Sequence, residues 1–250
     1  MDATYPKVGC CGFRLTKRQY AERFPVVEVQ QTFYQPPKKI ETLKRWRAEV
    51  PEDFEFTLKA WQLITHPYKS PTYRRLTTQL SQVELEQCGS FQPTPMVKEA
   101  WQTTRACAEA LSAKLILFQC PATFSPTLQN ITNMRRFFES IKRDDMTLLW
   151  EPRGRWPDSV IEPLCRELNL VHAVDPFLNR TVTPEFVYYR LHGGKDFKQI
   201  FSDTQLRELV GRLPACKPAY VMFNNINMLE DAERFQELVQ PLRFTQDLAL

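Results

Sequence analysis

Eight short runs of strand-forming residues recur along the chain, and this repetition restricts its fold more than any other feature. Most runs are rich in β-branched, leucine or aromatic residues, and each ends at a polar residue or a glycine, as strands commonly do. The runs are residues 8–12, 26–30, 54–59, 114–119, 147–151, 171–175, 186–192 and 219–225. Helix-period stretches lie between most of them. This alternation over 250 residues predicts an α/β fold, a (β/α)8 barrel of the TIM type.

Several of the intervening helices have recognisable starts. Thr16 is placed to cap a helix that runs to about residue 24, and Ser202 with Gln205 forms a capping box. Ser-Pro and Pro-Asp pairs open helices over residues 125–142 and 157–168, because proline is favoured in the first helical turn. These signals support the alternating pattern.

Two connections depart from a regular barrel. Residues 176–185, between the sixth and seventh runs, are too few for a crossover helix with its loops. Residues 64–94 form a long connection that contains three prolines, so we expect a cover or an inserted segment there. No linker composition interrupts the chain, and the sequence predicts a single domain over residues 1–250.

The composition excludes several classes of protein. Charge is mixed, with 33 Lys and Arg against 29 Asp and Glu, and no block of like charge resembles a nucleic-acid-binding tail. The N-terminus lacks a signal-peptide core and no apolar run is long enough to cross a bilayer, so we expect a cytoplasmic protein. Seven scattered cysteines without a CxxC pair indicate neither a disulfide framework nor a zinc ribbon.

Specific motifs accompany the strand runs. They are VGCCGF, VEVQQTFYQPP, FTLKAWQLITH, LFQCPATF, LWEPRGRW, VDP, YYRLHGG and YVMFNN, in this order. Together they resemble the YecE-like family, also called domain of unknown function 72, over nearly the whole chain. The resemblance implies a TIM-type barrel and carries no reaction with it. A likeness of such barrels to endonuclease IV is an analogy at the level of the fold.

The chain departs from the usual family pattern at two strand ends. Relatives typically have Ser-Gly-Trp where this chain has Cys11-Gly12-Phe13, and Asn-Ser where it has Gln30 and Gln31. Relatives also usually have a shorter third connection than the one that contains residues 64–94. A shared role for the side chains at the first two places is therefore not implied, and the longer connection suggests a cover that only some relatives have.

Polar residues occupy the inward face of the predicted barrel. Side chains alternate along a strand, so residues two apart share a face. On the seventh run Tyr188, Arg190 and His192 share the inward face. The same count turns further polar residues inward near the ends of the other runs: Glu28, Gln30, Lys59, Gln119, Glu151, Asp175 and Asn224. TIM-barrel active sites are built at these carboxyl ends, so we expect acids and bases to converge there. Arg153 would join from a loop, and a paired ion network that only closes the barrel is the alternative.

The three histidines differ in their expected roles. His192 is the leading proton-transfer group, because the ordinary pKa of histidine lies near neutrality. A neutral ring bonded to a strand neighbour is the alternative for His192. His66 begins the long connection and could reach the barrel mouth, or it is an ordinary loop residue. His172 counts onto the opposite face of its strand, which favours a structural role.

Two glycines follow the seventh run. In many TIM barrels, backbone N–H groups in this region hold a phosphate, so Gly193 and Gly194 are candidates for an anion seat. The nearby Arg190, Lys195 and His192 make an anion more plausible. A tight turn with no ligand is the alternative.

Three other kinds of chemistry are open at the mouth. Tyr34 and Trp61 lie near strand ends and could stack on a base or a sugar, although aromatic residues there are also ordinary packing. Lys59 could form a Schiff base if desolvated, and a neighbouring carboxylate would favour an anion clamp instead.

A single divalent metal ion is the third possibility. Carboxylate and imidazole groups suit such an ion, and the candidate ligands are Glu28, Glu151, Asp175 and His192. A site of the multi-zinc endonuclease type needs more inward histidines than this chain offers.

The sequence therefore favours an enzyme acting on an anionic, phosphate-bearing substrate, and a hydrolase that cleaves nucleic-acid phosphodiesters is one form of this hypothesis. In this hypothesis the acid–base or metal groups are Glu28, Glu151, Asp175 and His192, and the positive charge comes from Lys59, Arg153 and Arg190. Gln30, Gln119 and Asn224 would orient the substrate. The alternatives are a non-catalytic barrel that binds nucleic acid or a nucleotide and, more weakly, a lyase that uses Lys59. The partner is an anionic small molecule or a nucleic acid, and the oligomeric state is open.

Overall fold

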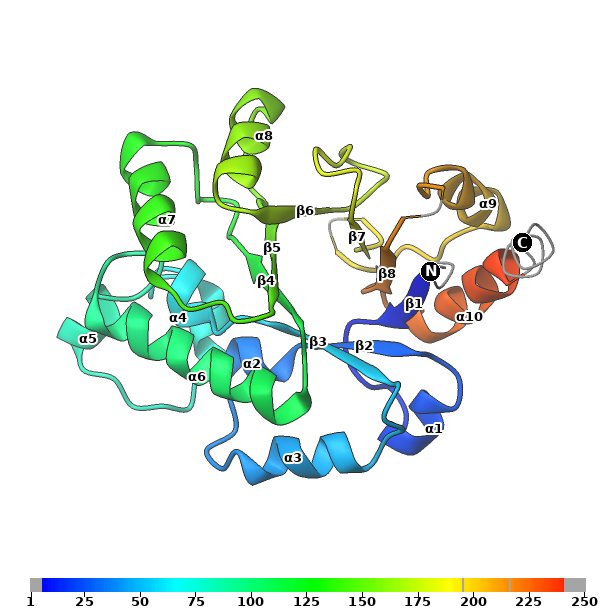
Figure 1. Ribbon diagram of the computed structural model, residues 1–250, viewed down its shortest axis with the longest axis horizontal. Helices are drawn as coiled ribbons and strands as arrows, with labels where there is room; N and C mark the ends of the chain where they lie inside the picture. The colour runs from blue at the N-terminus through cyan, green and yellow to red at the C-terminus, as the bar shows by residue number, and fades with distance from the viewer. Residues whose placement is uncertain (1–5, 195, 216, 241–250) are drawn as a thin grey trace. The chain divides into compact units, whose positions relative to one another are not determined.

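The computed structural model describes residues 6–194, 196–215 and 217–240. Within these ranges eight strands form a closed barrel in the order in which they occur in the chain. Helices lie between successive strands along most of the chain (Figure 1). The strands are β1 (Lys7–Cys10), β2 (Val26–Val29), β3 (Glu55–Lys59), β4 (Leu115–Gln119), β5 (Thr147–Glu151), β6 (Leu170–Val174), β7 (Val187–Leu191) and β8 (Ala219–Phe223). The predicted TIM-type barrel is confirmed.

The helices vary widely in length. They are α1 (Lys17–Ala21), α2 (Gln31–Tyr34), α3 (Glu41–Ala48), α4 (Gln62–Thr65), the 3-10 helix η1 (Pro71–Arg75), α5 (Gln82–Glu86), α6 (Pro95–Leu111), α7 (Leu128–Ser140), α8 (Asp158–Glu167), α9 (Asp203–Gly211) and α10 (Met228–Val239). None of the helices in the described ranges is both long and apolar enough to span a membrane.

The predicted helix starts hold with two adjustments. Thr16 caps α1, and Ser202 with Gln205 forms the capping box of α9. Helix α1 ends before residue 24, because the Pro25 ring disfavours helical backbone at the residue that precedes it. Helix α7 begins later than its Ser-Pro signal, since the Thr127 side chain accepts the Asn130 N–H and sets the first turn there.

The described chain divides into two compact units, each assembled from segments that are distant in sequence. The first unit draws on residues 6–28, 50–55 and 171–240, and the second on residues 29–49 and 56–170. The prediction of a single domain over residues 1–250 stays a prediction. Each unit is described below by itself.

The first unit contains β1, β7 and β8, which pair in parallel, and packs α1, α9 and α10 outside them. The register places Arg190 of β7 opposite Met222 of β8. Tyr20 of α1 is fully buried; its hydroxyl donates to the Val26 carbonyl at 3.0 Å and accepts the Cys10 N–H at 2.7 Å. This one side chain therefore ties α1 to both β1 and β2.

The second unit contains β3, β4 and β5, also paired in parallel, with α6 and α7 outside them. An aromatic cluster fills the space between strand and helices, with ring centroids 5.1–6.1 Å apart among Phe91, Phe118, Phe137 and Phe138. Each fully buried phenylalanine contributes roughly 1.5–3 kcal/mol from burial alone. The cluster accordingly holds β4 firmly behind the residues that project from its carboxyl end.

The two irregular connections are built as the sequence predicts. Between β3 and β4 the chain forms α4, η1 and α5 before α6 begins. Within it, Gly89 and Phe91 donate their N–H groups to Leu63 and Ile64, so the segment is folded back on α4. A covering role for residues 64–94 stays a prediction.

The connection from β6 to β7 contains no helix among its described residues. It is pinned by His172, whose Nδ1 accepts the Val182 N–H at 3.3 Å and whose carbonyl accepts from Thr181 at 3.0 Å. The structural role expected of His172 follows from these bonds.

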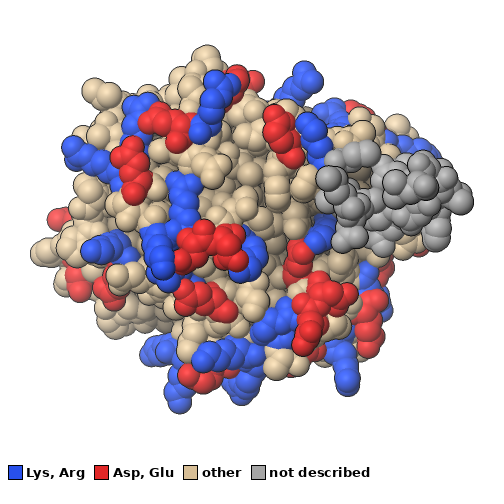
Figure 2. All heavy atoms as spheres, in the orientation of Figure 1, with Lys and Arg blue, Asp and Glu red and all other residues tan. Residues whose placement is uncertain are grey.

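Charged side chains of both signs intermingle on the face shown in Figure 2, with no block of one sign.

Candidate functional site

A buried ion pair lies inside the first unit, where β2 and β7 end. The Arg190 guanidinium donates from Nε to Glu28 Oε2 at 2.9 Å and from Nη2 to Glu28 Oε1 at 2.7 Å. The Tyr188 hydroxyl also donates to Glu28 Oε2, at 2.8 Å. Both charged side chains have no exposed surface. The inward row predicted for β7 is therefore real, and its arginine neutralises the glutamate of β2.

This geometry is compatible with a structural role for the pair, which is the alternative that the sequence left open. A two-point contact between guanidinium and carboxylate is among the strongest polar contacts in proteins, and its planar shape fixes both groups. Charges that are buried without such partners cost several kcal/mol. Because Arg190 and Glu28 satisfy each other, we infer that they hold neighbouring residues in place. The catalytic role predicted for Glu28 and the substrate-binding role predicted for Arg190 stay predictions.

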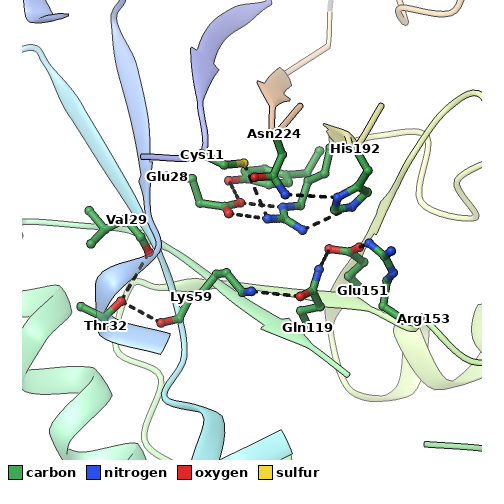
Figure 3. A network of polar contacts seen from close by, with 12 residues as sticks. Cys11, Glu28, Val29, Thr32, Lys59, Gln119, Glu151, Arg153, His192 and Asn224 are labelled. Atoms are coloured by element: carbon green, nitrogen blue, oxygen red, sulfur yellow. Dashed lines mark hydrogen bonds and ion pairs between the residues drawn. The ribbon is translucent and has the colours of Figure 1, made fainter. Parts of the chain in front are cut away.

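His192 lies between the arginine and the end of β8. Its Nε2 is 3.4 Å from Nη1 of Arg190, and its Nδ1 is 3.2 Å from the Asn224 side-chain amide (Figure 3). A guanidinium can only donate, so Nε2 must be the acceptor and the ring proton sits on Nδ1. The Asn224 atom that faces Nδ1 in the structure is Nδ2, so a proton on Nδ1 requires the amide to be turned with its oxygen toward the ring. The bond to Arg190 thus selects one tautomer of His192, which is the state a proton-transfer role would start from.

Asp175 contacts the backbone and not the histidine ring. Its Oδ2 accepts the His192 N–H at 3.1 Å, and its Oδ1 accepts the Phe177 N–H at 3.0 Å. Its side chain is almost fully buried. Asp175 therefore fixes where β7 ends, which sets the position of the His192 side chain. Its predicted catalytic role stays a prediction.

Cys11 is a member of this network that the sequence did not single out. Its Sγ lies 3.6 Å from Arg190 Nη2. Burial, and then the negative charge of Glu28, raise the pKa of the Cys11 thiol well above its ordinary value. Cys10 turns the other way, and its Sγ donates to the Met228 carbonyl at 3.3 Å. Cys11 therefore remains a thiol, and the side chains of Cys10 and Cys11 have different surroundings. Alternation along β1 was the signal for this arrangement.

Gly193 and Gly194 form the turn after β7. Both have left-handed backbone, with φ of 66° and 81°. A Cβ at Gly193 would meet the Asn225 Cβ at 2.5 Å and the Gln199 carbonyl oxygen at 2.9 Å. The turn is thus one that only glycine fits without strain. Lys195 lies outside the described residues, and an anion seat here stays a prediction.

In the second unit, a separate line of hydrogen-bonded polar side chains crosses the carboxyl ends of β3, β4 and β5. Lys59 Nζ donates to Gln119 Oε1 at 2.9 Å, and Gln119 Nε2 donates to Glu151 Oε2 at 2.9 Å. Arg153 Nη1 donates to Glu151 Oε1 at 3.1 Å (Figure 3). Parallel pairing places Gln119 directly opposite Glu151, which explains their contact. The four predicted residues are brought together as a continuous chain.

The second line carries more positive than negative charge. Its ends are the cations Lys59 and Arg153, with the Glu151 carboxylate between them. The Lys59 ammonium is almost fully buried and lies 3.9 Å from the centre of the Phe33 ring, a cation–π distance. The Arg153 side chain is 33% exposed, against 4% for Glu151. Arg153 is therefore the member best placed to meet a solute. Phe33 was not predicted, and only its place just after β2 hinted at it.

His66 lies in the second unit, at the end of α4. Its ring packs edge-on against Phe33, with centroids 4.9 Å apart, and its Nδ1 is 2.8 Å from the Thr65 hydroxyl. Burial, and then the positive charge of Lys59, lower the pKa of His66 to about 3. The ring is neutral near pH 7, so it suits a hydrogen-bonding role better than that of a general acid.

The remaining predicted residues are placed as follows. Gln30 is half-buried and precedes α2. Tyr34 carries the Arg75 guanidinium 3.5 Å above its ring centre, so that face of the ring is already covered. Trp61 is 8% exposed, and its Nε1 has no hydrogen-bond partner among the described residues. Stacking of a base or sugar on Tyr34 or Trp61 stays a prediction.

The described residues contain no group of three or more His, Cys, Asp or Glu side chains that could hold a metal ion. The carboxylates and the imidazole proposed as ligands have other partners. Glu28 accepts from Arg190, Asp175 from backbone N–H groups, and Glu151 from Gln119. A metal site on the four candidate ligands thus has no support from this geometry.

Comparisons with other proteins agree with the fold. The family described as "Protein of unknown function DUF72" matches residues 5–248. No curated protein matches the chain. A DUF72 family protein from Enterococcus faecalis V583 is 21% identical, with a TM-score of 0.71 over 94% of this chain and 98% of that one.

Two further solved structures are more distant. A DUF72 family protein from Thermotoga maritima MSB8 is 19% identical, with a TM-score of 0.65 over 94% of this chain and 99% of that one. An AP endonuclease of family 2 from Brucella melitensis is 12% identical, with a TM-score of 0.55 over 95% of this chain and 99% of that one. At such identities the likeness concerns the fold alone.

Proposed function

The chain belongs to the DUF72 family, and we propose that it is an enzyme that acts on an anionic, phosphate-bearing substrate at the carboxyl ends of β3, β4 and β5. Ligand and catalytic sites of TIM-type barrels are characteristically at this end of the strands. The substrate class follows from the charges found there, because fold similarity alone does not transfer an activity.

One observation carries the proposal: the unbroken line Lys59–Gln119–Glu151–Arg153. Two cations flank one carboxylate in this line, and cationic side chains gathered in this way attract an anion. Arginine also matches the oxygens of a phosphate through two parallel hydrogen bonds. Since Arg153 is partly exposed while its partner Glu151 is buried, Arg153 can turn toward a phosphate without uncovering the line.

A hydrolytic step then follows from the same contacts. When Arg153 binds the phosphate, Oε1 of Glu151 loses the hydrogen bond from Arg153 and can accept a proton from water. A water molecule attacks phosphorus, its proton passes to Glu151, and the bond from phosphorus to the leaving oxygen breaks. The leaving oxygen takes its proton from solvent. Gln119 holds the other oxygen of Glu151 and so orients the base, while the Lys59 charge stabilises the negative charge that develops.

Two variants distinguish the role proposed for Glu151 in catalysis from the role proposed for Arg153 in binding. Glu151→Gln keeps the shape and removes the base, so turnover of bis(p-nitrophenyl) phosphate should fall by about 10²–10⁴-fold with little change in binding. Arg153→Gln removes a charge-assisted contact, so binding of a nucleoside monophosphate should weaken about 10- to 100-fold. Arg166→Gln on α8, an exposed arginine paired with Glu162, is the control with the same charge change.

The measurements are diester hydrolysis and calorimetric titration with the nucleotide. The enzyme proposal fails if the wild-type protein neither hydrolyses the diester nor binds the nucleotide. It also fails if both variants match the Arg166→Gln control. Binding of single-stranded DNA or RNA at low salt without any turnover would instead identify the non-catalytic alternative.

A further inference from the structure

A cavity on the outer side of the second unit lies away from the polar line. Helices α6 and α7, both green in Figure 1, form its walls, together with the residues just before α6 and just after α7. Its volume is about 710 Å³. None of the residues that form the line Lys59–Gln119–Glu151–Arg153 belongs to its lining. The cavity is therefore separate from the site of the proposed enzyme function.

The floor of the cavity is apolar. It is formed by Val97 and Trp101 of α6 and by Phe137 of α7, with Ile141 just beyond α7. Val97, Trp101 and Phe137 are at most 5% exposed and belong to the core. Trp101 and Phe137 are in edge-on contact, with ring centroids 6.3 Å apart. A floor built from core residues keeps its shape, and it offers a flat or elongated apolar group a preformed surface.

The rim of the cavity is basic. Lys98 and Arg105 of α6, Arg136 of α7 and Lys142 line it, and no acidic residue does so among the described residues. Arg105 pairs with Glu109 and Asp144, and Lys142 pairs with Asp144. Lys98 and Arg136 have no carboxylate partner within the described chain. The exposed side chains of Lys98 on α6 and Arg136 on α7 thus lie at the edge of the apolar floor.

From this combination we propose a binding site for a small amphipathic anion between α6 and α7. The ligand has an aromatic or acyl body that lies on Trp101 and Phe137. It has one carboxylate, sulfonate or phosphate group that Arg136 and Lys98 bind. The volume falls within the roughly 300–1,000 Å³ typical of small-molecule sites, which favours a small ligand over a peptide. Charge complementarity selects an anion, since every charged group in the described lining is basic.

A pair of fluorescent probes tests the need for both halves of the ligand. 8-Anilino-1-naphthalenesulfonate has the apolar rings and one anionic group, and N-phenyl-1-naphthylamine has the same rings without the sulfonate. The sulfonate probe should bind with one site per chain and about tenfold more tightly than the neutral probe. Equal affinity of the two probes would overturn the anionic part of the proposal.

Variants locate the binding. Arg136→Gln together with Lys98→Gln should bring the affinity for the sulfonate probe down to that of the neutral probe and leave the latter unchanged. Arg135→Gln is the matched control, because Arg135 is the neighbouring residue of α7, pairs with Glu167 and does not line the cavity. Ser140→Trp, at an exposed lining residue, should obstruct part of the cavity and weaken the binding of both probes at least tenfold.

The readout must be separated from unfolding, because partly unfolded proteins also bind the sulfonate probe. Each variant should retain the wild-type near-ultraviolet circular dichroism and urea midpoint. Where a variant does not, amide exchange of the wild-type chain decides: bound probe should protect residues 92–105 and 136–142. Protection elsewhere alone would contradict the site. If an acidic amphipathic peptide displaces the probe at a lower concentration than dodecyl phosphate does, the proposal of a small ligand is overturned and the site binds a peptide.

Discussion

The guanidinium of Arg190 binds both oxygens of the Glu28 carboxylate, and neither side chain is exposed to solvent. Each charge is tolerated in the interior because the other is present. Removing one of two buried partners leaves a charge without compensation, which is far more destabilising than removing both.

Glu28→Gln should therefore lower the free energy of unfolding by about 3–5 kcal/mol. The double variant Glu28→Met with Arg190→Met should lose less than the single variant, because no charge is left buried. Urea denaturation of the wild-type, single-variant and double-variant proteins measures the three values. A single variant that loses under about 1 kcal/mol, or a double variant that loses more than the single one, would contradict the role given to the pair.

The buried His66 should make stability depend on pH in the acid range. Its folded-state pKa is about 3, against about 6.5 in the unfolded chain. The unfolded state therefore binds the extra proton first. The free energy of unfolding should fall as the pH drops below 6.5, by about 2 kcal/mol at pH 5 from this residue alone, and level off below pH 3.

The comparison is with His66→Gln, which cannot take up this proton. Urea denaturation of both proteins from pH 8 to pH 4.5 gives the two slopes. They should agree above pH 7 and diverge below pH 6.5, with the wild-type protein steeper by up to one proton. Parallel curves over the whole range would show that His66 is not held neutral by its surroundings.

Asp231 of α10 should anchor the loop that follows the Gly193–Gly194 turn. It is fully buried, and its Oδ2 accepts the Phe201 N–H at 3.1 Å and the Asn225 amide at 2.6 Å. Asp231→Asn replaces an acceptor oxygen by an NH2 group, which cannot accept a hydrogen bond from the surrounding donors. The free energy of unfolding should therefore fall by about 2–3 kcal/mol. The exposed neighbour Glu230→Gln is the control and should change stability by under about 0.5 kcal/mol. Faster amide exchange at Phe201 in the first variant alone would confirm the local effect.

The two glycines after β7 should respond differently to alanine. At Gly193 a Cβ would meet Asn225 at 2.5 Å, whereas at Gly194 the nearest atoms are 3.9 Å away. Both positions have positive φ, which costs about 1–2 kcal/mol for alanine. Gly193→Ala adds the clash and should lose clearly more. Gly211→Ala, with nothing within 4 Å, is the control and should be neutral or slightly stabilising. Equal losses at Gly193 and Gly194 would contradict the close approach of Asn225.

The inward rows of the barrel were accessible from the sequence because strand periodicity is exact. Counting by two along β7 placed Tyr188 and Arg190 on one face, and both contact Glu28. The same count placed Gln119 and Glu151 on inward faces, and they are hydrogen-bonded. Long polar side chains near the ends of strands are thus a dependable signal for buried polar groups in a barrel.

The hydrogen-bond partner of each polar side chain could not be predicted from the sequence, because it depends on the stagger between strands and on loop conformation. Asp175 illustrates this. Its carboxylate accepts the backbone N–H groups of Phe177 and His192, where the sequence predicted a contact with basic side chains. The low pKa of His66 likewise results from packing against Phe33 and from the nearness of Lys59. Neither the contacts of Asp175 nor the surroundings of His66 can be predicted from the spacing of residues in the sequence.

The amide of Gln119 separates Lys59 from Glu151, and it works as a connector with a fixed direction. Its oxygen must face the ammonium and its NH2 must face the carboxylate, since the reversed amide would set donor against donor at one end and acceptor against acceptor at the other. The orientation of this neutral group is thus dictated by the charges at its two ends. A proton gained by Glu151 would release the amide to turn, and Lys59 would then lose its hydrogen bond to Gln119. Two groups that do not touch are in this way coupled through a rotation that costs no covalent change.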